Sequence, residues 1–146
     1  MGKSFLADIP ANSFQLNFTN ASVASDGANA VVASAAFCAP ADIKVKRAWY
    51  VPWADAATKG TATTSATYKR INLLNGGTAG TATTIVASAN ITASIASRGS
   101  KAFTTTSNNT ASGGEILYFS ALTVGGTSNE GTILRAGVLQ IEYELL

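Results

Sequence analysis

Strict alternation of apolar and polar residues is the feature that most constrains how this chain can fold. Near the C-terminal end, apolar residues at positions 139, 141, 143 and 145 alternate with one amide and two carboxylates. Successive side chains of a β-strand point to opposite faces of the sheet, so this period of two predicts a strand with one apolar face. We expect Leu139, Ile141 and Tyr143 to lie in the core. We expect Glu142 and Glu144 to lie outside it.

The same period recurs along the chain, with turn residues between the runs. Small residues and β-branched Thr are common and Lys and Glu are scarce, a balance that favours sheets over long exposed helices. Eight strands are predicted, at residues 14–19, 29–38, 43–51, 67–74, 84–91, 101–106, 116–122 and 139–145. Eight strands in 146 residues indicate an all-β, single-domain β-sandwich, of which the eight-stranded jelly roll is the commonest form.

The first twelve residues have neither alternation nor a turn to fold them back. They predict an extended N-terminal arm at 1–12, ahead of a β-sandwich domain at 13–146. The arm carries four residues that would each gain from burial against a partner, namely Phe5, Leu6, Ile9 and Pro10. We expect these residues to contact a neighbouring subunit or another protein.

Two inner strands give specific predictions about which residues share a face. One face of the strand at 43–51 is expected to hold Ile43, Val45, Arg47, Trp49 and Val51. One side of the strand at 84–91 is expected to hold Ile85, Ala87, Ala89 and Ile91. Cys38, the single cysteine, ends an apolar run and is expected to be an inert core residue.

Charge is low overall but uneven along the chain. The net charge of +2 is too small for a dedicated nucleic-acid binder. Residues 44–101 nevertheless hold eight of the ten basic residues and a single carboxylate, Asp55. Lys44 and Lys46 share a strand face, so this segment could dock onto an acidic surface. The alternative is that the basic side chains are scattered over several solvated faces.

The residues needed for most catalytic chemistry are missing. The chain has no histidine, which removes the usual general base and every pairing of a nucleophile with His. One cysteine without histidine cannot complete a zinc site, and we expect no cofactor. Glu142 and Glu144 lie about 7 Å apart along one strand, a spacing seen in glycosidases, but we interpret them as the solvated face of that strand. We therefore predict that the protein is not an enzyme.

Targeting signals are also missing from the sequence. The start lacks the apolar region of a signal peptide, and no stretch approaches the roughly 18 apolar residues of a membrane span. We expect synthesis in a cytoplasm and no membrane partner.

Aromatic and basic residues alternate in two neighbouring segments. The rings are those of Trp49, Tyr50, Trp53 and Tyr68, and the cations are Lys46, Arg47, Lys69 and Arg70. Such a mixture could stack sugars or bases. Because side chains alternate along strands, some rings must point inward, and we favour core or subunit packing.

Three segments of the chain follow one another without large insertions. The first is Ala-Asp-Ile-Lys-Val-Lys-Arg-Ala-Trp-Tyr-Val-Pro at 41–52. The second is Tyr-Lys-Arg-Ile-Asn-Leu-Leu-Asn-Gly-Gly at 68–77, and the third is Gly-Thr-Ala-Thr-Thr-Ile-Val-Ala-Ser at 80–88. This succession resembles the small decoration (cement) proteins of tailed bacteriophage capsids, many of which have a strand ending in Tyr-x-Pro, a strand with an Asn-x-Gly turn and a Val-Ala-Ser strand in the same order. Gly-Gly-Glu at 113–115 departs from the family's frequent Ala-Gly-Asp.

The resemblance implies a structural virion protein without catalytic residues. Such a protein would be a homotrimer on the outer capsid surface, where it bridges copies of the major capsid protein. Under this interpretation Lys44, Lys46 and Trp53 join the arm as expected contact residues. The alternative is a carbohydrate-binding or receptor-binding module of the tail-fibre type, using Trp49, Tyr50 and Trp53.

Overall fold

The computed structural model describes residues 16–23, 32–55, 58–59, 68–97, 99–125, 131–132 and 134–146. These ranges form twelve β-strands and no helix. The seven longer strands are β1 (Leu16–Val23), β2 (Val32–Cys38), β3 (Ile43–Pro52), β5 (Tyr68–Asn75), β6 (Thr84–Ile91), β10 (Ile116–Val124) and β12 (Gly137–Leu145). The five two-residue strands are β4 (Thr58–Lys59), β7 (Lys101–Ala102), β8 (Thr104–Thr105), β9 (Thr110–Ala111) and β11 (Gly131–Thr132).

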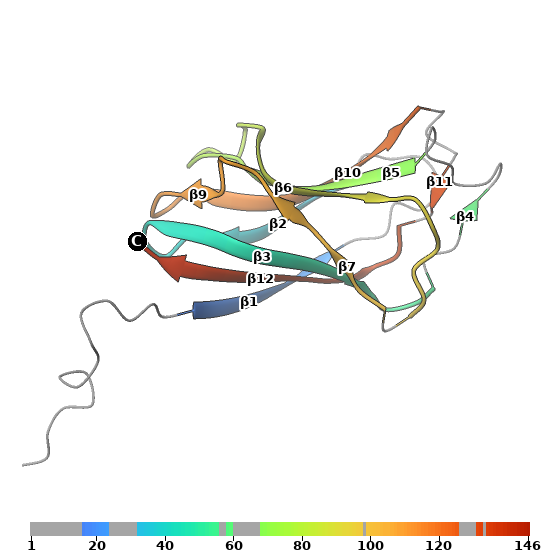
Figure 1. Ribbon diagram of the computed structural model, residues 1–146. Helices are drawn as coiled ribbons and strands as arrows, with labels where there is room; N and C mark the ends of the chain where they lie inside the picture. The colour runs from blue at the N-terminus through green and yellow to red at the C-terminus, as the bar shows by residue number, and fades with distance from the viewer. Residues whose placement is uncertain are drawn as a thin grey trace, which may run out of the picture.

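Two five-stranded antiparallel sheets form the two layers visible in Figure 1. Sheet A has the order β1-β12-β3-β7, with β9 also paired to β3. Sheet B has the order β2-β10-β5-β6-β8, and β11 and β4 pair separately. The all-β prediction is confirmed and the layers agree with a β-sandwich, whereas the finer jelly-roll form stays a prediction. The predicted arm, residues 1–12, lies outside the described residues.

The core fills the space between the two sheets. Leu139, Ile141 and Tyr143 on β12 are buried in it, as the alternation predicts. Ring contacts join the layers, with centroids 5.1 Å apart for Phe37 and Tyr143 and 6.0 Å apart for a second pair from β3 and β10. Offset or tilted aromatic pairs at such distances add to the stabilisation from burial.

A β-bulge in β3 overturns the predicted face of that strand. Val45 is opposite Tyr143 and Arg47 is opposite Glu142, so Lys46 is an additional residue without a partner on β12. One extra residue moves every following side chain to the other face. The buried set is therefore Ile43, Val45, Ala48, Tyr50 and Pro52. The prediction that Arg47, Trp49 and Val51 share a face with Ile43 and Val45 is wrong.

A second bulge has the same effect in β6. Leu73 is opposite Ala87 and Leu74 is opposite Ile85, which leaves Val86 as the additional residue. Ala87, Ala89 and Ile91 are buried as predicted, but Ile85 is exposed because it lies before the bulge.

The prediction for Cys38 is also wrong. Its side chain is exposed, because Cys38 is the last residue of β2 and alternates with Phe37, which packs against the core.

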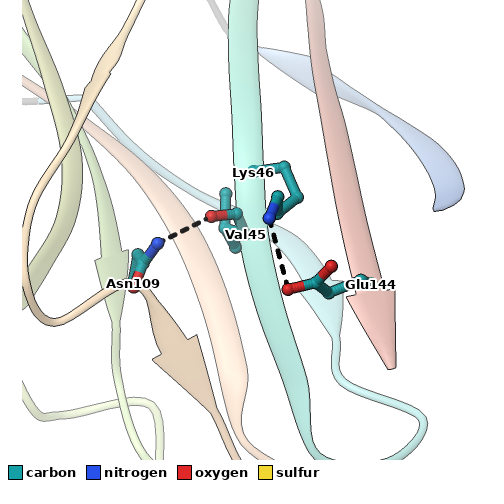
Figure 2. A network of polar contacts seen from close by, with 4 residues as sticks. All are labelled: Val45, Lys46, Asn109 and Glu144. Carbon is teal, nitrogen blue, oxygen red and sulfur yellow. Dashed lines mark hydrogen bonds and ion pairs between the residues drawn. The ribbon is translucent and has the colours of Figure 1, made fainter. Parts of the chain in front are cut away.

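The segment from β7 to β9 connects the two sheets. It pairs with β3 through β7, with β6 through β8 and again with β3 through β9. Side chains of this segment bond to backbone beside both bulges. Thr106 donates its hydroxyl to the Ile85 carbonyl at 2.7 Å, and Asn109 donates its amide to the Val45 carbonyl at 3.0 Å (Figure 2). Backbone carbonyls next to the bulges thus accept hydrogen bonds from side chains in addition to the regular strand pairing.

Candidate docking surface

The outward side of β3 gathers cations and an aromatic ring on one side of sheet A. After the bulge, Lys46 and Arg47 are both exposed, and Trp49 and Val51 are half-buried on the same side. Lys44, before the bulge, is half-buried there too. We call these five residues, Lys44, Lys46, Arg47, Trp49 and Val51, the β3 outer face.

Two ion pairs join this surface to β12. Lys46 Nζ lies 3.3 Å from Glu144 Oε1, as Figure 2 shows, and Arg47 Nε lies 3.1 Å from Glu142 Oε2. The carboxylate side chains are only 8% and 5% exposed, against 40% for Lys46 and 65% for Arg47. A nearly buried carboxylate needs such a partner to offset its desolvation.

The burial of Glu142 and Glu144 overturns the expectation that they lie in solvent. Both project from the outward side of β12, as the alternation requires. β12 ends near the chain terminus, but it lies between β1 and β3 in sheet A rather than at the edge. Neighbours on both sides therefore cover the two carboxylates.

These pairs neutralise part of the charge asymmetry seen along the chain, because they involve two of the eight cations of residues 44–101. The basic strand β3 lies directly beside β12, which supplies two of the four carboxylates in residues 102–146. Lys44, Lys46 and Arg47 against Glu142 and Glu144 leave a local net charge of +1. The surface is therefore weakly basic.

Arg47 also lies over an aromatic ring. Its guanidinium carbon is 5.9 Å from the centre of the Trp49 ring, within the range of a cation–π contact. The ion pair with Glu142 uses Nε, and no partner of the two terminal nitrogens lies in the described part of the chain. The terminal nitrogens thus remain open to a ligand.

Sheet B carries two further cations of the basic segment, Lys69 and Arg70. Arg70 donates Nε to Asn90 Oδ1 at 3.2 Å and Nη2 to the Tyr68 hydroxyl at 3.0 Å. Lys69 is buried, and its Nζ donates to Thr123 Oγ1 at 2.9 Å. The described cations of the basic segment 44–101 are therefore spread over different sheets and do not form one surface.

The structure brings together only some of the predicted contact residues. Phe5, Leu6, Ile9 and Pro10 lie outside the described residues. Lys44 and Lys46 are neighbours on the β3 outer face. Trp53 is 60% exposed but follows the far end of β3, roughly 23 Å along the strand from Lys46.

The aromatic residues do not form one platform. Tyr50 is fully buried, and its hydroxyl donates to the Arg135 carbonyl at 2.6 Å. Trp49 is half-buried on the opposite face of β3, and Tyr68 lies on sheet B. Core packing, the favoured interpretation, is confirmed for Tyr50.

Sequence reasoning missed the combination of Arg47, Trp49 and Glu142. The period-two pattern places Arg47 with the core residues, and only a bulge places it beside Glu142. No local signal marks this bulge in the sequence, because Val-Lys-Arg-Ala fits an unbroken strand equally well.

A second polar cluster lies at the turn before β10. Asn75 Nδ2 donates to Glu115 Oε2 at 2.6 Å, and the Ser112 N–H donates to the same oxygen at 2.8 Å. The Asn75 bond and then the Ser112 bond lower the pKa of Glu115. The same Asn75 side chain accepts the Gly77 N–H at 2.8 Å, so the cluster ties two turns together.

Other surfaces offer fewer chemical groups. A hollow of about 310 Å³ is lined by residues 91–96 and 99–101, with Lys101 as its charged group. No three His, Cys, Asp or Glu side chains in the described ranges lie close enough together to hold a metal ion. Within those ranges there is also no helix with the length and apolar character of a membrane span.

The fold and site define an all-β, two-sheet protein with a weakly basic, ion-paired sheet surface. Comparisons of the chain with protein-family models, with curated proteins and with solved structures find no match. The function must therefore be argued from the residues themselves.

Proposed function

We propose that this chain is a structural virion protein that binds the outside of a tailed-phage head and bridges neighbouring capsid subunits. The observation that carries the proposal is the β3 outer face, an outward sheet surface on which Arg47 lies 5.9 Å from the centre of the Trp49 ring. Arginine and tryptophan are the residue types most enriched at the energetic centres of protein interfaces. The resemblance of residues 41–52, 68–77 and 80–88 to decoration proteins supports the same function.

The proposed assembly is a homotrimer made in the host cytoplasm and added to the outer capsid surface. Exposed apolar side chains favour such contacts, among them Phe18, Trp53 and Leu146. Closed cyclic symmetry would bury them against other copies or the major capsid protein. The arm residues Phe5, Leu6, Ile9 and Pro10 are proposed to take part in these contacts.

The alternative of a carbohydrate-binding module has less support. A sugar platform needs several rings on one exposed surface, and Tyr50 is fully buried. Of the three proposed sugar-binding rings, only Trp49 and Trp53 are left at the surface, and they are separated by about 13 Å along the strand direction.

The proposal is tested by sedimentation with heads of the virus whose genome encodes the chain. Heads that lack the chain would be mixed with purified protein and pelleted. We expect saturable co-sedimentation and greater resistance of the heads to heat or chelation. Protein that stays in the supernatant at saturating concentration would contradict the proposal, and binding to a glycan array instead would support the alternative.

A further inference from the structure

We propose that the β3 outer face binds a carboxylate-bearing segment of a protein partner, and that the terminal guanidinium nitrogens of Arg47 recognise the carboxylate. The proposal takes the partner's identity from the proposed function, but its chemistry from the residues of sheet A. It names a ligand group and a recognition residue for a surface that is otherwise defined only by its position.

Arg47 is held in place by two contacts. Glu142 pairs with its Nε at 3.1 Å, and the centre of the Trp49 ring lies 5.9 Å from its guanidinium carbon. A charged partner at the Nε end and an aromatic ring nearby restrict how the guanidinium can turn. Less side-chain entropy is then lost when a ligand binds.

The free part of Arg47 matches a carboxylate. A guanidinium has five N–H donors in a fixed plane, and two parallel bonds to a carboxylate are its strongest common arrangement. The Arg47 side chain is 65% exposed, and its terminal nitrogens have no partner among the described residues. The geometry thus leaves the forked end available while the Nε end is occupied.

The local charge favours one or two carboxylates over a polyphosphate. The three cations of the β3 outer face are offset by Glu142 and Glu144, which leaves a net +1. Nucleic-acid binding depends on several uncompensated cations, each neutralising a phosphate. The carboxylates paired with Lys46 and Arg47 would repel an extended anionic backbone.

Arg70 on sheet B is a natural matched control. It also lies 5.9 Å from a ring centre, that of Tyr68, and it also belongs to a β-strand. Its Nε and Nη2 both donate to neighbours, Asn90 and Tyr68. Its forked end is therefore already committed, and we expect no carboxylate binding there.

The test is an NMR titration of ¹⁵N-labelled protein with a blocked pentapeptide containing two glutamates. We expect saturable shifts of the Arg47 Nε–H and Trp49 Nε1–H signals, with a dissociation constant on the order of 1 mM. The same peptide with glutamines should leave both signals in place. Arg47→Lys keeps the charge but removes the fork, and should weaken binding roughly tenfold. Arg70→Lys should leave it unchanged.

Several outcomes would overturn the proposal. One is that the Arg47 and Trp49 signals do not shift at saturating peptide. Another is that Arg47→Lys and Arg70→Lys weaken peptide binding equally. A third is that oligo-dT or a maltooligosaccharide shifts the same signals and binds more tightly than the peptide. The spectrum of each variant checks that it is folded. The titration uses no capsid. If the protein binds heads but does not bind the peptide, only the carboxylate site is rejected. Peptide binding without head binding would reject the proposed function alone.

Discussion

Asn109 completes the hydrogen bonding of β3 at Val45, the residue directly before the bulge. The Val45 N–H donates to the Asn109 carbonyl at 2.8 Å. Asn109 Nδ2 in turn donates to the Val45 carbonyl at 3.0 Å, the bond drawn in Figure 2. Between β7 and β9, which both pair with β3, the segment pairs with β6 through β8. On this side β3 therefore lacks a continuous neighbour strand. The amide side chain replaces the missing strand partner.

Replacing Asn109 should therefore destabilise the fold. Asn109→Ala leaves the buried Val45 carbonyl without this donor, and we expect a loss of about 1–3 kcal/mol in the free energy of unfolding. Asn108→Ala is the matched control, because the Asn108 side chain is exposed. Urea denaturation measures both variants. Equal stability of the two variants would show that the amide does not support β3.

Gly137 is expected to be intolerant of any side chain. A Cβ there would clash with the Val51 carbonyl oxygen and would lie 2.9 Å from Pro52 Cα, so the backbone would have to move. We expect Gly137→Ala to cost about 2 kcal/mol or more. Gly114→Ala is the comparison: φ is +86° and no atom lies within 4 Å of the added Cβ, so only conformational strain of about 1 kcal/mol applies. A smaller loss at Gly137 than at Gly114 would contradict the close approach of β12 to β3.

The pair of Arg47 and Glu142 should show a measurable coupling. Glu142 is nearly buried but Arg47 is well exposed, so solvent screens the pair and we expect about 1 kcal/mol in a double-mutant cycle of Arg47→Ala and Glu142→Gln. The control cycle combines Arg70→Ala with Glu142→Gln, whose effects should add because the residues lie on different sheets. Additivity in the first cycle would mean that the two groups act independently.

Glu115 should contribute to stability above acidic pH. Its pKa is lowered in the folded protein, so the contribution is present above the unfolded value and lost as pH falls through the folded value. Asn75→Ala removes the largest cause and should raise the pKa of Glu115 toward 4.5, reducing the loss of stability on acidification. Carboxyl NMR titration measures this pKa. The control Asn90→Ala should leave the pKa of Glu115 unchanged. An unchanged pKa of Glu115 in Asn75→Ala as well would contradict the role given to the Asn75 hydrogen bond.

The sequence predicts the strands of this protein better than their faces. Each of the eight predicted strands overlaps a strand of the structure, although the region 101–106 forms β7 and β8 instead of one strand, and residues 14–15, 29–31 and 67 of the predicted strands lie outside the described residues. Alternation also predicts Leu139, Ile141 and Tyr143 in the core. Strand positions and alternation depend on residues that are close together in the chain, so they can be predicted from the sequence.

Features that depend on strand pairing could not be predicted in this way. The bulges at Lys46 and Val86 become visible only in the register with β12 and β5. Because of the first bulge, Arg47 and Trp49 belong to the β3 outer face and do not share the face of Ile43 and Val45 that the alternation predicts for them. The burial of Glu142 likewise depends on β12 lying between two strands that are distant in sequence.

The most direct test of the central proposal is a cryo-EM reconstruction of heads incubated with the purified chain, beside heads without it. We predict added density on the outer surface, as trimers that each contact at least two neighbouring capsid subunits and turn the β3 outer face toward an acidic segment of one of them. Isolated monomers would contradict the trimer and the bridging role. Identical reconstructions at saturating protein, or added density inside the head, would contradict the proposed function itself.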